Sequence, residues 1–239
     1  MVLSCSLFLA TSVARKRGGY PLSSLAMLDF LQPTFIIAIL IALSVHEWAH
    51  AFVAYRLGDP TAKNEGRVTL NPIAHLDPVG TILFILVGFG WGKPVPVNPM
   101  YFSHYKRDSA LVAAAGPASN FVLATGAFIL ITMLGLQTIG GSILQQFASQ
   151  LLHDILTINL VLMAFNLLPV APLDGSKVIH LFIPLNYEEQ YQEFMSKGPW
   201  ILLALIVLGR ATSVDILSYW ISFIIEPIFR IMDAISRLL

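Results

Sequence analysis

The stretch TFIIAILIALSVHEWAHAFVAY, residues 34–55, decides the fold of this chain and raises a question about its chemistry. Its length is close to the ~20 residues with which an apolar α-helix crosses about 30 Å of hydrocarbon. Two histidines and a glutamate nevertheless interrupt it. An ionised side chain at the centre of a bilayer costs on the order of 2.5–3.5 kcal/mol, and such residues in membrane spans usually mark function. We therefore expect His46, Glu47 and His50 to form part of a site.

The composition extends this membrane interpretation to the rest of the chain. Hydrophobic residues make up 56% of the sequence and charged residues 12%, whereas an ordinary soluble domain has roughly 25% charged residues. The mean hydropathy is +0.74. Further apolar runs lie at 79–89, 110–134, 151–168, 200–208 and 216–231. The sequence therefore predicts an all-α, multi-pass membrane protein with about six transmembrane helices.

The charge balance and the cysteine content narrow the classes of partner and cofactor. Lys+Arg and Asp+Glu number 14 each, so no basic field indicates binding to nucleic acid. Cys5 is the only cysteine. We therefore expect neither an intrachain disulfide nor a thiolate metal site. The expected surroundings are a lipid bilayer.

The chain is expected to consist of a short N-terminal segment and one domain. In residues 1–27, an apolar run precedes Arg15, Lys16 and Arg17, which reverses the order of charge and hydrophobicity in a signal peptide. We expect this segment to be dispensable, with Met27 as an alternative initiator. Residues 28–239 contain all the predicted spans without an internal repeat, and are expected to form a single transmembrane domain.

Two segments between the spans are expected to be extended. The alternation in RVTL, residues 67–70, ended by an Asn-Pro pair, is typical of a short strand. The glycines and prolines of GFGWGKPVPVNP, residues 88–99, exclude a helix. Because proline lacks an N–H, PVPVN is expected to be an extended element with interrupted donors. Both segments are predicted to be short re-entrant β or extended elements.

The three polar residues of the first span have the spacing of a metal site. His46 and His50 are one helical turn apart, so their side chains project from one face of a helix. Two imidazoles so placed can both bind zinc at about 2.0–2.1 Å, and the intervening Glu47 can act on a zinc-bound water. The alternative of solvated or core histidines is disfavoured here, because an apolar span has no solvent to satisfy three polar groups.

A catalytic zinc site needs a third protein ligand, and the candidate is Asp174 in FNLLPVAPLDGSKV. Pro169 and Pro172 break the helix before it, which allows the carboxylate to turn inward at membrane depth. The alternative is that Asp174 caps the short helix that follows. The local sequence by itself favours the cap and leaves the ligand open.

The motifs taken together resemble a known family. HEWAH (46–50), GPASN (116–120) and FNLLPVAPLDG (165–175) look like those of the site-2 proteases, which are intramembrane zinc metalloproteases. GRVTLNP (66–72) and GWGKPVPVNP (90–99) are similar to the compact branch without PDZ or CBS modules. The likeness extends over residues 35–177, with the motifs in the same order.

The resemblance implies an activity and a set of roles. His46, His50 and Asp174 would bind one Zn²⁺, and Glu47 would be the general base. The domain at 28–239 would be a metalloprotease that hydrolyses a peptide bond within or near the transmembrane segment of a membrane-protein substrate, in a prokaryotic cell membrane. Leu173 precedes the aspartate where some members have proline, and many compact members share this LDG form.

Several further residues are candidates for contacts with the substrate. Asn120 is a neutral amide in a span and is predicted to donate to the oxyanion of the tetrahedral intermediate. Asn166 is a weaker candidate for holding the substrate or the loop. A substrate helix must unwind before cleavage, and Val95, Val97 and Asn98 could pair with the unwound segment. The alternative is that PVPVN is an ordinary re-entrant connection.

Three other functions compete with this interpretation. A metal-ion transporter would need polar residues spread through several spans, whereas here they are concentrated at one place. A catalytically silent membrane scaffold is disfavoured by the intact set His46, Glu47, His50 and Asp174. A zinc protease of the CAAX-processing or heat-shock type would need a glutamate ligand in a later apolar span, and Glu226, followed by a proline, does not match it.

Overall fold

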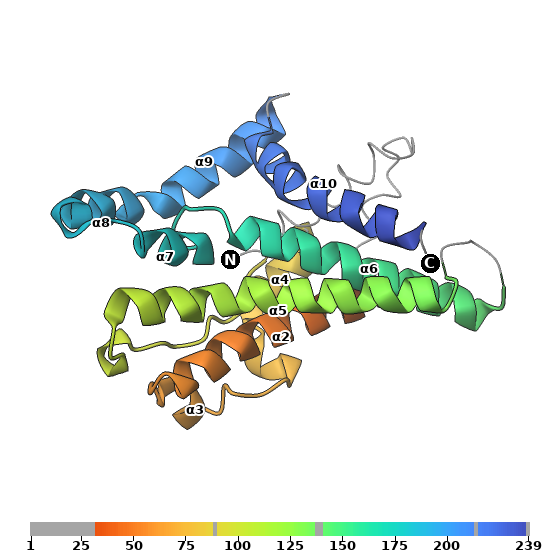
Figure 1. The fold of residues 1–239 in the computed structure, drawn as a ribbon, viewed down its shortest axis with the longest axis horizontal. Coiled ribbons are helices and arrows are strands. Elements are labelled where there is room, and N and C mark those ends of the chain that lie inside the picture. The colour runs from red at the N-terminus through yellow and green to blue at the C-terminus, as the bar shows by residue number, and fades with distance from the viewer. Residues whose placement is uncertain (1–31, 88–89, 137–140, 213–214, 238–239) are drawn as a thin grey trace.

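The fold is built around three long helices that pack side by side (Figure 1). The computed structural model describes residues 32–87, 90–136, 141–212 and 215–237. The long helices are α2 (Pro33–Arg56), α5 (Tyr105–Met133) and α6 (Ile143–Asn166), and each is long and apolar enough to cross a membrane. The described residues contain no β-strand, so the prediction of an all-α protein is confirmed.

The remaining helices are short or carry more charge. They are α3 (Thr61–Asn64), η3 (Pro72–His75), α4 (Pro78–Val87), η4 (Pro99–Tyr101), α7 (Asp174–His180), η5 (Leu185–Tyr187), α8 (Glu188–Ser196), α9 (Gly198–Ala211) and α10 (Ile216–Ser236). In Figure 1, α9 and α10 form an arm on the side of α6 away from α2, and α10 packs against α6.

Small residues allow α2 to lie close to its neighbours. Pro33 begins the helix, where its fixed φ is already helical and its missing N–H costs no hydrogen bond. Ala38, Ala42 and Ala54 are fully buried on the packed face. Side chains of this size let helix backbones approach closely, which is the usual basis of helix packing in membranes. Gly58, with φ +102°, follows the end of the helix in a conformation that favours glycine.

The helix α6 is the central element of the bundle. Its N-terminus has a capping box, in which Gln145 N–H donates to Ser142 Oγ and Ser142 N–H donates to Gln145 Oε1. Toward its C-terminus, Leu160 and Phe165 belong to a buried cluster shared with α5, α9 and α10. Ile158 belongs to a second cluster shared with α2 and α4. The C-terminal half of α6 is therefore enclosed on several sides.

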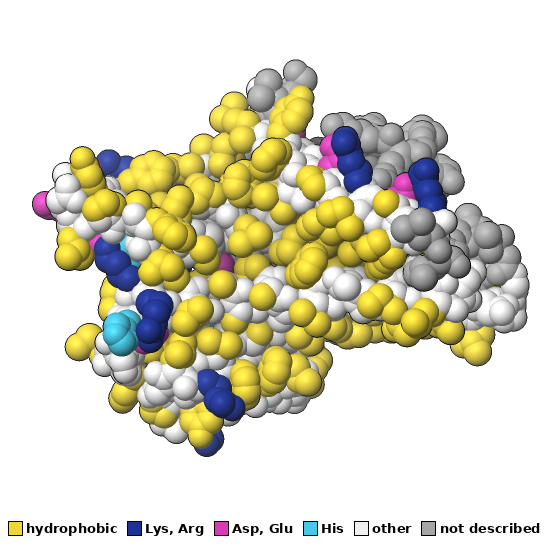
Figure 2. Space-filling view, viewed as in Figure 1, with side chains coloured by type: hydrophobic (Ala, Val, Ile, Leu, Met, Phe, Trp, Pro, Cys, Tyr) yellow, Lys and Arg dark blue, Asp and Glu magenta, His cyan; other side chains and the backbone are white. Residues whose placement is uncertain are grey.

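The surface is consistent with a lipid environment. Large apolar side chains are exposed along α5, among them Phe121, Val122 and Met133. In the face shown in Figure 2, hydrophobic side chains cover much of the middle, and charged side chains gather toward the ends. This distribution is expected of a protein whose middle section lies in hydrocarbon.

The predicted number of spans is not confirmed. Among the described residues, three helices rather than about six meet the length and hydropathy required of a span. The α4 helix has 10 residues and α9 has 14, which is short for a crossing. The α10 helix has 21 residues but carries charged pairs such as Arg230–Glu226 and Arg237–Asp233 at its C-terminal half and end.

The prediction of a strand at 67–70 is wrong. Its backbone groups bond to nearby turns: Arg67 N–H donates to the Ala62 carbonyl at 2.8 Å, and the Thr69 carbonyl lies 2.8 Å from His75 Nε2. Residues 93–98 belong to no helix and form no ladder, and their expected extended conformation stays a prediction; one isolated bridge joins Leu76 to Gly92. The N-terminal segment 1–27 lies outside the described residues.

Candidate metal centre

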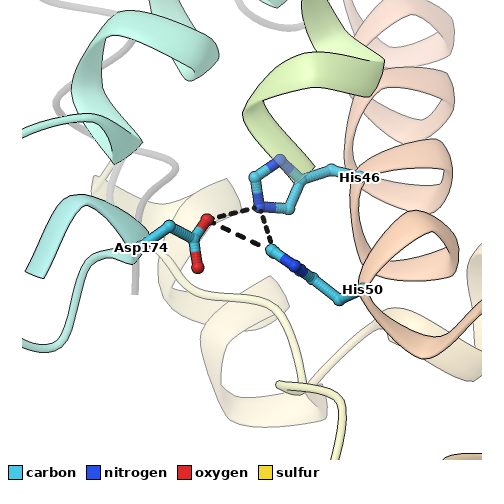
Figure 3. Close-up of side chains that lie close together, drawn as sticks. All are labelled: His46, His50 and Asp174. Carbon is cyan, nitrogen blue, oxygen red and sulfur yellow. Dashed lines mark hydrogen bonds and ion pairs between the residues drawn. The ribbon is translucent and has the colours of Figure 1, made fainter. Parts of the chain in front are cut away.

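The helix α2 directs two imidazoles toward one point. His46 and His50 lie one turn apart on its buried face, with 4% and 8% of their surfaces exposed. Their Nε2 atoms are 3.0 Å apart (Figure 3). The other ring nitrogen of His50, Nδ1, lies 2.7 Å from the Val112 carbonyl. Because a carbonyl can only accept, His50 Nδ1 carries a proton, and in the neutral imidazole that binds a metal Nε2 then offers the lone pair.

The carboxylate of Asp174 reaches the same point from the other side of the site. Asp174 Oδ2 lies 3.2 Å from His46 Nε2 and 3.2 Å from His50 Nε2 (Figure 3). Leu173, and not Asp174, occupies the N-cap of α7, and no side chain caps this helix end. Asp174 Oδ2 is buried and has no hydrogen-bond donor. The capping alternative is therefore not supported, and the carboxylate is directed at the histidines.

The three atoms fit a zinc ion. They form a triangle with sides of 3.0, 3.2 and 3.2 Å. Tetrahedral zinc, with ligands at about 2.0–2.2 Å, separates two ligand atoms by about 3.3–3.6 Å. Converging acceptors in a buried site need a proton or a cation between them, and the near-equilateral triangle is a few tenths of an ångström smaller than that of bound zinc. No other such group of three side chains occurs within the described ranges of the chain.

Close approach of α5 completes the centre, and it depends on Gly116. A Cβ built on Gly116 would lie 2.4 Å from His50 Nε2 and 2.6 Å from His46 Cε1. Any side chain at this position would therefore displace the imidazoles. Asn120, one turn further along α5, is fully buried, and its Oδ1 lies 2.6 Å from His46 Nδ1. Within the GPASN motif, Gly116 thus leaves space for the two imidazoles, and Asn120 forms a hydrogen bond with the ring of His46.

The polar atoms of Asn120 and Asn166 are held within the protein. Asn120 Nδ2 donates to the Ala42 carbonyl at 3.2 Å and to Asn159 Oδ1 at 2.8 Å. Donation to an oxyanion would require one of these bonds to break, so that role stays a prediction. Asn166 Nδ2 donates to the Leu162 carbonyl at 3.0 Å, and Asn166 lines the cavity described next.

Glu47 faces a cavity of ≈ 560 Å³ that also contains the three candidate ligands. Its wall is mostly apolar and includes Leu43, Val95, Val97, Leu203 and Ile206. Glu47 Oε2 accepts a hydrogen bond from the Val95 N–H at 3.1 Å. The carboxylate and the candidate metal centre therefore share one cavity, in which a small polar reactant can reach both.

The segment at 93–98 is held by residues that the sequence reasoning missed. Arg67 donates to the Lys93 carbonyl at 2.7 Å. The Lys93 N–H donates to the His75 carbonyl at 2.9 Å, and the Asn98 N–H donates to Asp59 Oδ2 at 2.7 Å. Arg67, His75 and Asp59 are all buried. Buried charge next to a proline-rich segment is the feature by which Arg67 and Asp59 could have been found.

The far end of α7 is held by an ion-pair network that involves α8 and the first turn of α5. His180 Nε2 lies 2.7 Å from Glu188 Oε1, and Lys106 forms an ion pair with the same carboxylate. The Lys106 ammonium, with a further contribution from the Gln192 amide, lowers the pKa of Glu188 to about 2. Glu188 is therefore ionised at neutral pH, and it links α7 and α8 to the beginning of α5.

The fold and this centre define a class of protein: a helical membrane protein with a buried two-histidine, one-aspartate metal centre. The chain matches the family model of peptidase family M50 over residues 34–208. It therefore belongs to peptidase family M50, the site-2 protease family, as the motifs predict.

Named relatives agree with this assignment. The chain is 41% identical over 191 residues to "Putative zinc metalloprotease YwhC" of Bacillus subtilis, covering 79% of this chain and 83% of that protein. It is 30% identical over 176 residues to "Putative zinc metalloprotease Rip2" of Mycolicibacterium smegmatis, covering 71% of this chain and 63% of that protein. No solved structure shows a significant match. His46, His50 and Asp174 lie close enough to form a zinc-binding site, and the prediction of a zinc cofactor is confirmed. Their assignment as the zinc ligands stays a prediction.

Zinc content tests the ligand set. The purified protein should contain about one zinc per chain, and His46→Ala or Asp174→Ala should lose most of it, because two remaining ligands hold zinc poorly. His153→Ala, which changes an exposed histidine of α6, is the matched control and should keep its zinc. Elemental analysis of detergent-purified variants gives the result. Unchanged zinc in both ligand variants would refute the assignment.

Gly116→Ala tests the close approach of α5. The added Cβ overlaps both imidazoles, so we expect zinc affinity to fall at least about tenfold, as for other changes next to metal ligands. Gly126→Ala lies in the same helix, where a Cβ would meet nothing within 4 Å. This control should keep its zinc and gain about 0.5–1 kcal/mol of helix stability. Chelator competition measures both affinities. Equal zinc affinity in the two variants would show that the space at Gly116 is not needed.

Proposed function

We propose that this protein is an intramembrane zinc metalloprotease that hydrolyses a peptide bond within or near the transmembrane segment of membrane-protein substrates. The protein would cross a prokaryotic cell membrane several times. The observation that carries the proposal is the carboxylate of Glu47 in one cavity with His46, His50 and Asp174, between apolar helices. Membership of a peptidase family supports the reaction class.

The proposed roles follow from the positions of the side chains. His46, His50 and Asp174 would hold the zinc ion. Zinc, when bound, supplies Lewis-acid polarisation of the scissile carbonyl and makes water a stronger acid. Glu47 would take a proton from the attacking water and pass it to the leaving amide nitrogen. The Val95 N–H holds the Glu47 carboxylate in the cavity, at 3.1 Å, where it can carry out both transfers.

The distribution of buried polar residues supports a hydrolase over an ion path. Among the buried polar side chains near the middle of the long helices, His46, His50, Asn120 and Asn159 contact one another or the same candidate ligands. Ser44 is also buried there, and its hydroxyl is satisfied within α2 by the Leu40 carbonyl. A transport path would need such groups spaced along the direction of movement.

The segment at 93–98 is the proposed substrate contact. Val95 and Val97 line the cavity, and Asn98 closes the segment. The prolines at 94 and 96 have no N–H, and the N–H groups of Val95 and Asn98 are already donated to Glu47 and Asp59. Within the described residues, the Val97 N–H and the carbonyls at 94–97 have no bond. These groups would pair with the backbone of an unwound substrate, and Asn166 would contact it from the opposite wall.

Glu47→Gln tests the reaction. An amide cannot accept the proton of the attacking water, so we expect cleavage to fall about 10²- to 10⁴-fold while zinc remains bound. Glu65→Gln, which changes an exposed glutamate in the turn after α3, is the matched control. The measurement is co-expression with candidate single-span proteins, followed by detection of fragments.

The outcomes of this experiment separate the roles of Glu47. Cleavage by Glu47→Gln within threefold of the parent would exclude Glu47 as the general base. Loss of zinc in Glu47→Gln would instead indicate a structural role for this carboxylate. A variant that keeps its zinc and loses cleavage has the behaviour expected of a base.

Val97→Pro tests how the substrate is held. The substitution removes the Val97 N–H, which no described group of the enzyme accepts and which would pair with the substrate. We therefore expect KM to rise several-fold while zinc remains bound. Val97→Ala keeps the N–H and should have the smaller effect. On the substrate, replacing a helix-breaking Gly or Pro near the cut by Leu should slow cleavage, because Gly and Pro lower the cost of unwinding by about 1 and 3 kcal/mol. Equal KM values for both variants, with no effect of the substrate changes, would exclude this capture.

A further inference from the structure

A line of buried polar side chains crosses three helices behind the zinc site. His46 Nδ1 on α2 lies 2.6 Å from Asn120 Oδ1 on α5. Asn120 Nδ2 lies 2.8 Å from Asn159 Oδ1 on α6, and Asn159 Nδ2 lies 2.8 Å from the Ile155 carbonyl. Both asparagines have 0% of their surfaces exposed. Water therefore cannot exchange for any member of the line, and each group must be satisfied by its neighbours.

The far end of this line fixes the direction of every hydrogen bond in it. The Ile155 carbonyl can only accept, so the amide nitrogen of Asn159 must face it and Oδ1 must face α5. Asn120 must then donate through Nδ2, which also faces the Ala42 carbonyl, a second group that only accepts. Asn120 Oδ1 is thereby left facing the imidazole. His46 must donate through Nδ1, and its Nε2 lone pair faces the metal position.

We propose that Asn159 is a positioning residue of the zinc site, acting through Asn120 to fix the ring orientation and the tautomer of His46. It touches neither the zinc position nor the cavity wall. The proposal rests on zinc ligation by His46, which is part of the proposed function. Zinc affinity is measurable without any substrate, so a failure of this proposal and a failure of the proposed proteolysis give different results.

The two histidine ligands are held in different ways. His50 donates directly to a backbone carbonyl of α5, Val112, which is fixed by the helix itself. His46 donates to a side-chain amide, which can rotate by half a turn and exchange its oxygen for its nitrogen. Asn159 and the Ala42 carbonyl together remove this freedom, because a rotated Asn120 would present its oxygen to both acceptors, of which Asn159 Oδ1 is the nearer, at 2.8 Å against 3.2 Å. The orientation of His46 therefore depends on a residue of α6 that His46 does not contact.

Two substitutions at position 159 separate positioning from packing. Asn159→Leu keeps a similar volume and removes both polar atoms. Asn159→Asp keeps an oxygen that accepts from Asn120 whether the carboxyl is ionised or protonated, and the protonated form also donates to the Ile155 carbonyl. We expect Asn159→Leu to weaken zinc binding about tenfold or more, within the 10- to 100-fold range of lost outer contacts to metal ligands. Asn159→Asp should stay within about threefold of the parent protein.

The experiment is a chelator competition for zinc on the full-length protein in detergent. It compares the parent, Asn159→Leu, Asn159→Asp, Asn120→Ala and the double variant Asn120→Ala/Asn159→Leu, with Ser44→Ala as the matched control. Ser44 is buried in α2 and bonds only to the Leu40 carbonyl, so its loss removes a buried polar group outside the line. Because Asn159 acts through Asn120, the double variant should bind zinc no more weakly than Asn120→Ala alone.

Three results would overturn the proposal. The first is that Asn159→Leu binds zinc within twofold of the parent protein. The second is that Asn159→Leu and Asn159→Asp weaken zinc binding equally. The third is that the effects of Asn120→Ala and Asn159→Leu on zinc affinity multiply in the double variant. Circular dichroism of the zinc-free proteins identifies any variant that fails to fold. If Asn159→Leu does so, rescue of zinc binding by Asn159→Asp relative to Asn120→Ala still decides the question. If Asn159→Leu weakens zinc binding but the parent protein cleaves none of the tested substrates, the result supports this inference and contradicts the proposed function.

Discussion

The convergence of His46 Nε2, His50 Nε2 and Asp174 Oδ2 within 3.0–3.2 Å is the constraint on which the rest of the structure depends. Three acceptors in an apolar bundle repel one another unless a cation lies between them, and burial in hydrocarbon makes the unpaired state costly. The surrounding helices therefore have to bring the ligands together and also exclude alternatives. Gly116 leaves room for the imidazoles. The helical structure is interrupted between α6 and α7, and Asp174 at the beginning of α7 is directed toward them.

Each ligand is also fixed from behind. His50 is held by a carbonyl of α5, His46 by the Asn120 and Asn159 amides, and α7 by the bond from Tyr191 to the Ser176 carbonyl and by the ion pairs of Glu188. The geometry of the centre is thus a property of how α2, α5, α6 and α7 pack, and side chains far from the cavity contribute to it.

The sequence predicted the centre better than its surroundings, for physical reasons. A helical turn fixes the spacing of His46 and His50, whereas Asp174 is far along the chain and only the family resemblance favoured it over a cap. Asn159 was missed because one asparagine in an apolar run has no spacing to identify it; its role exists only where three helices meet. The strand at 67–70 failed because alternation does not reveal which neighbours accept its hydrogen bonds. The span count is not confirmed because, among the described residues, α4 and α9 are short and α10 is charged.

The spread of the ligands along the chain has a consequence for biogenesis. The two histidines lie on the first described helix, α2, and the aspartate arrives only with α7, after α5 and α6. During synthesis and insertion, α2 therefore enters the membrane with an incomplete ligand set, and a pair of histidines alone does not make a catalytic zinc site. The centre can form only after the later helices have docked. The proposed proteolysis would therefore depend on the assembled bundle and not on α2 alone.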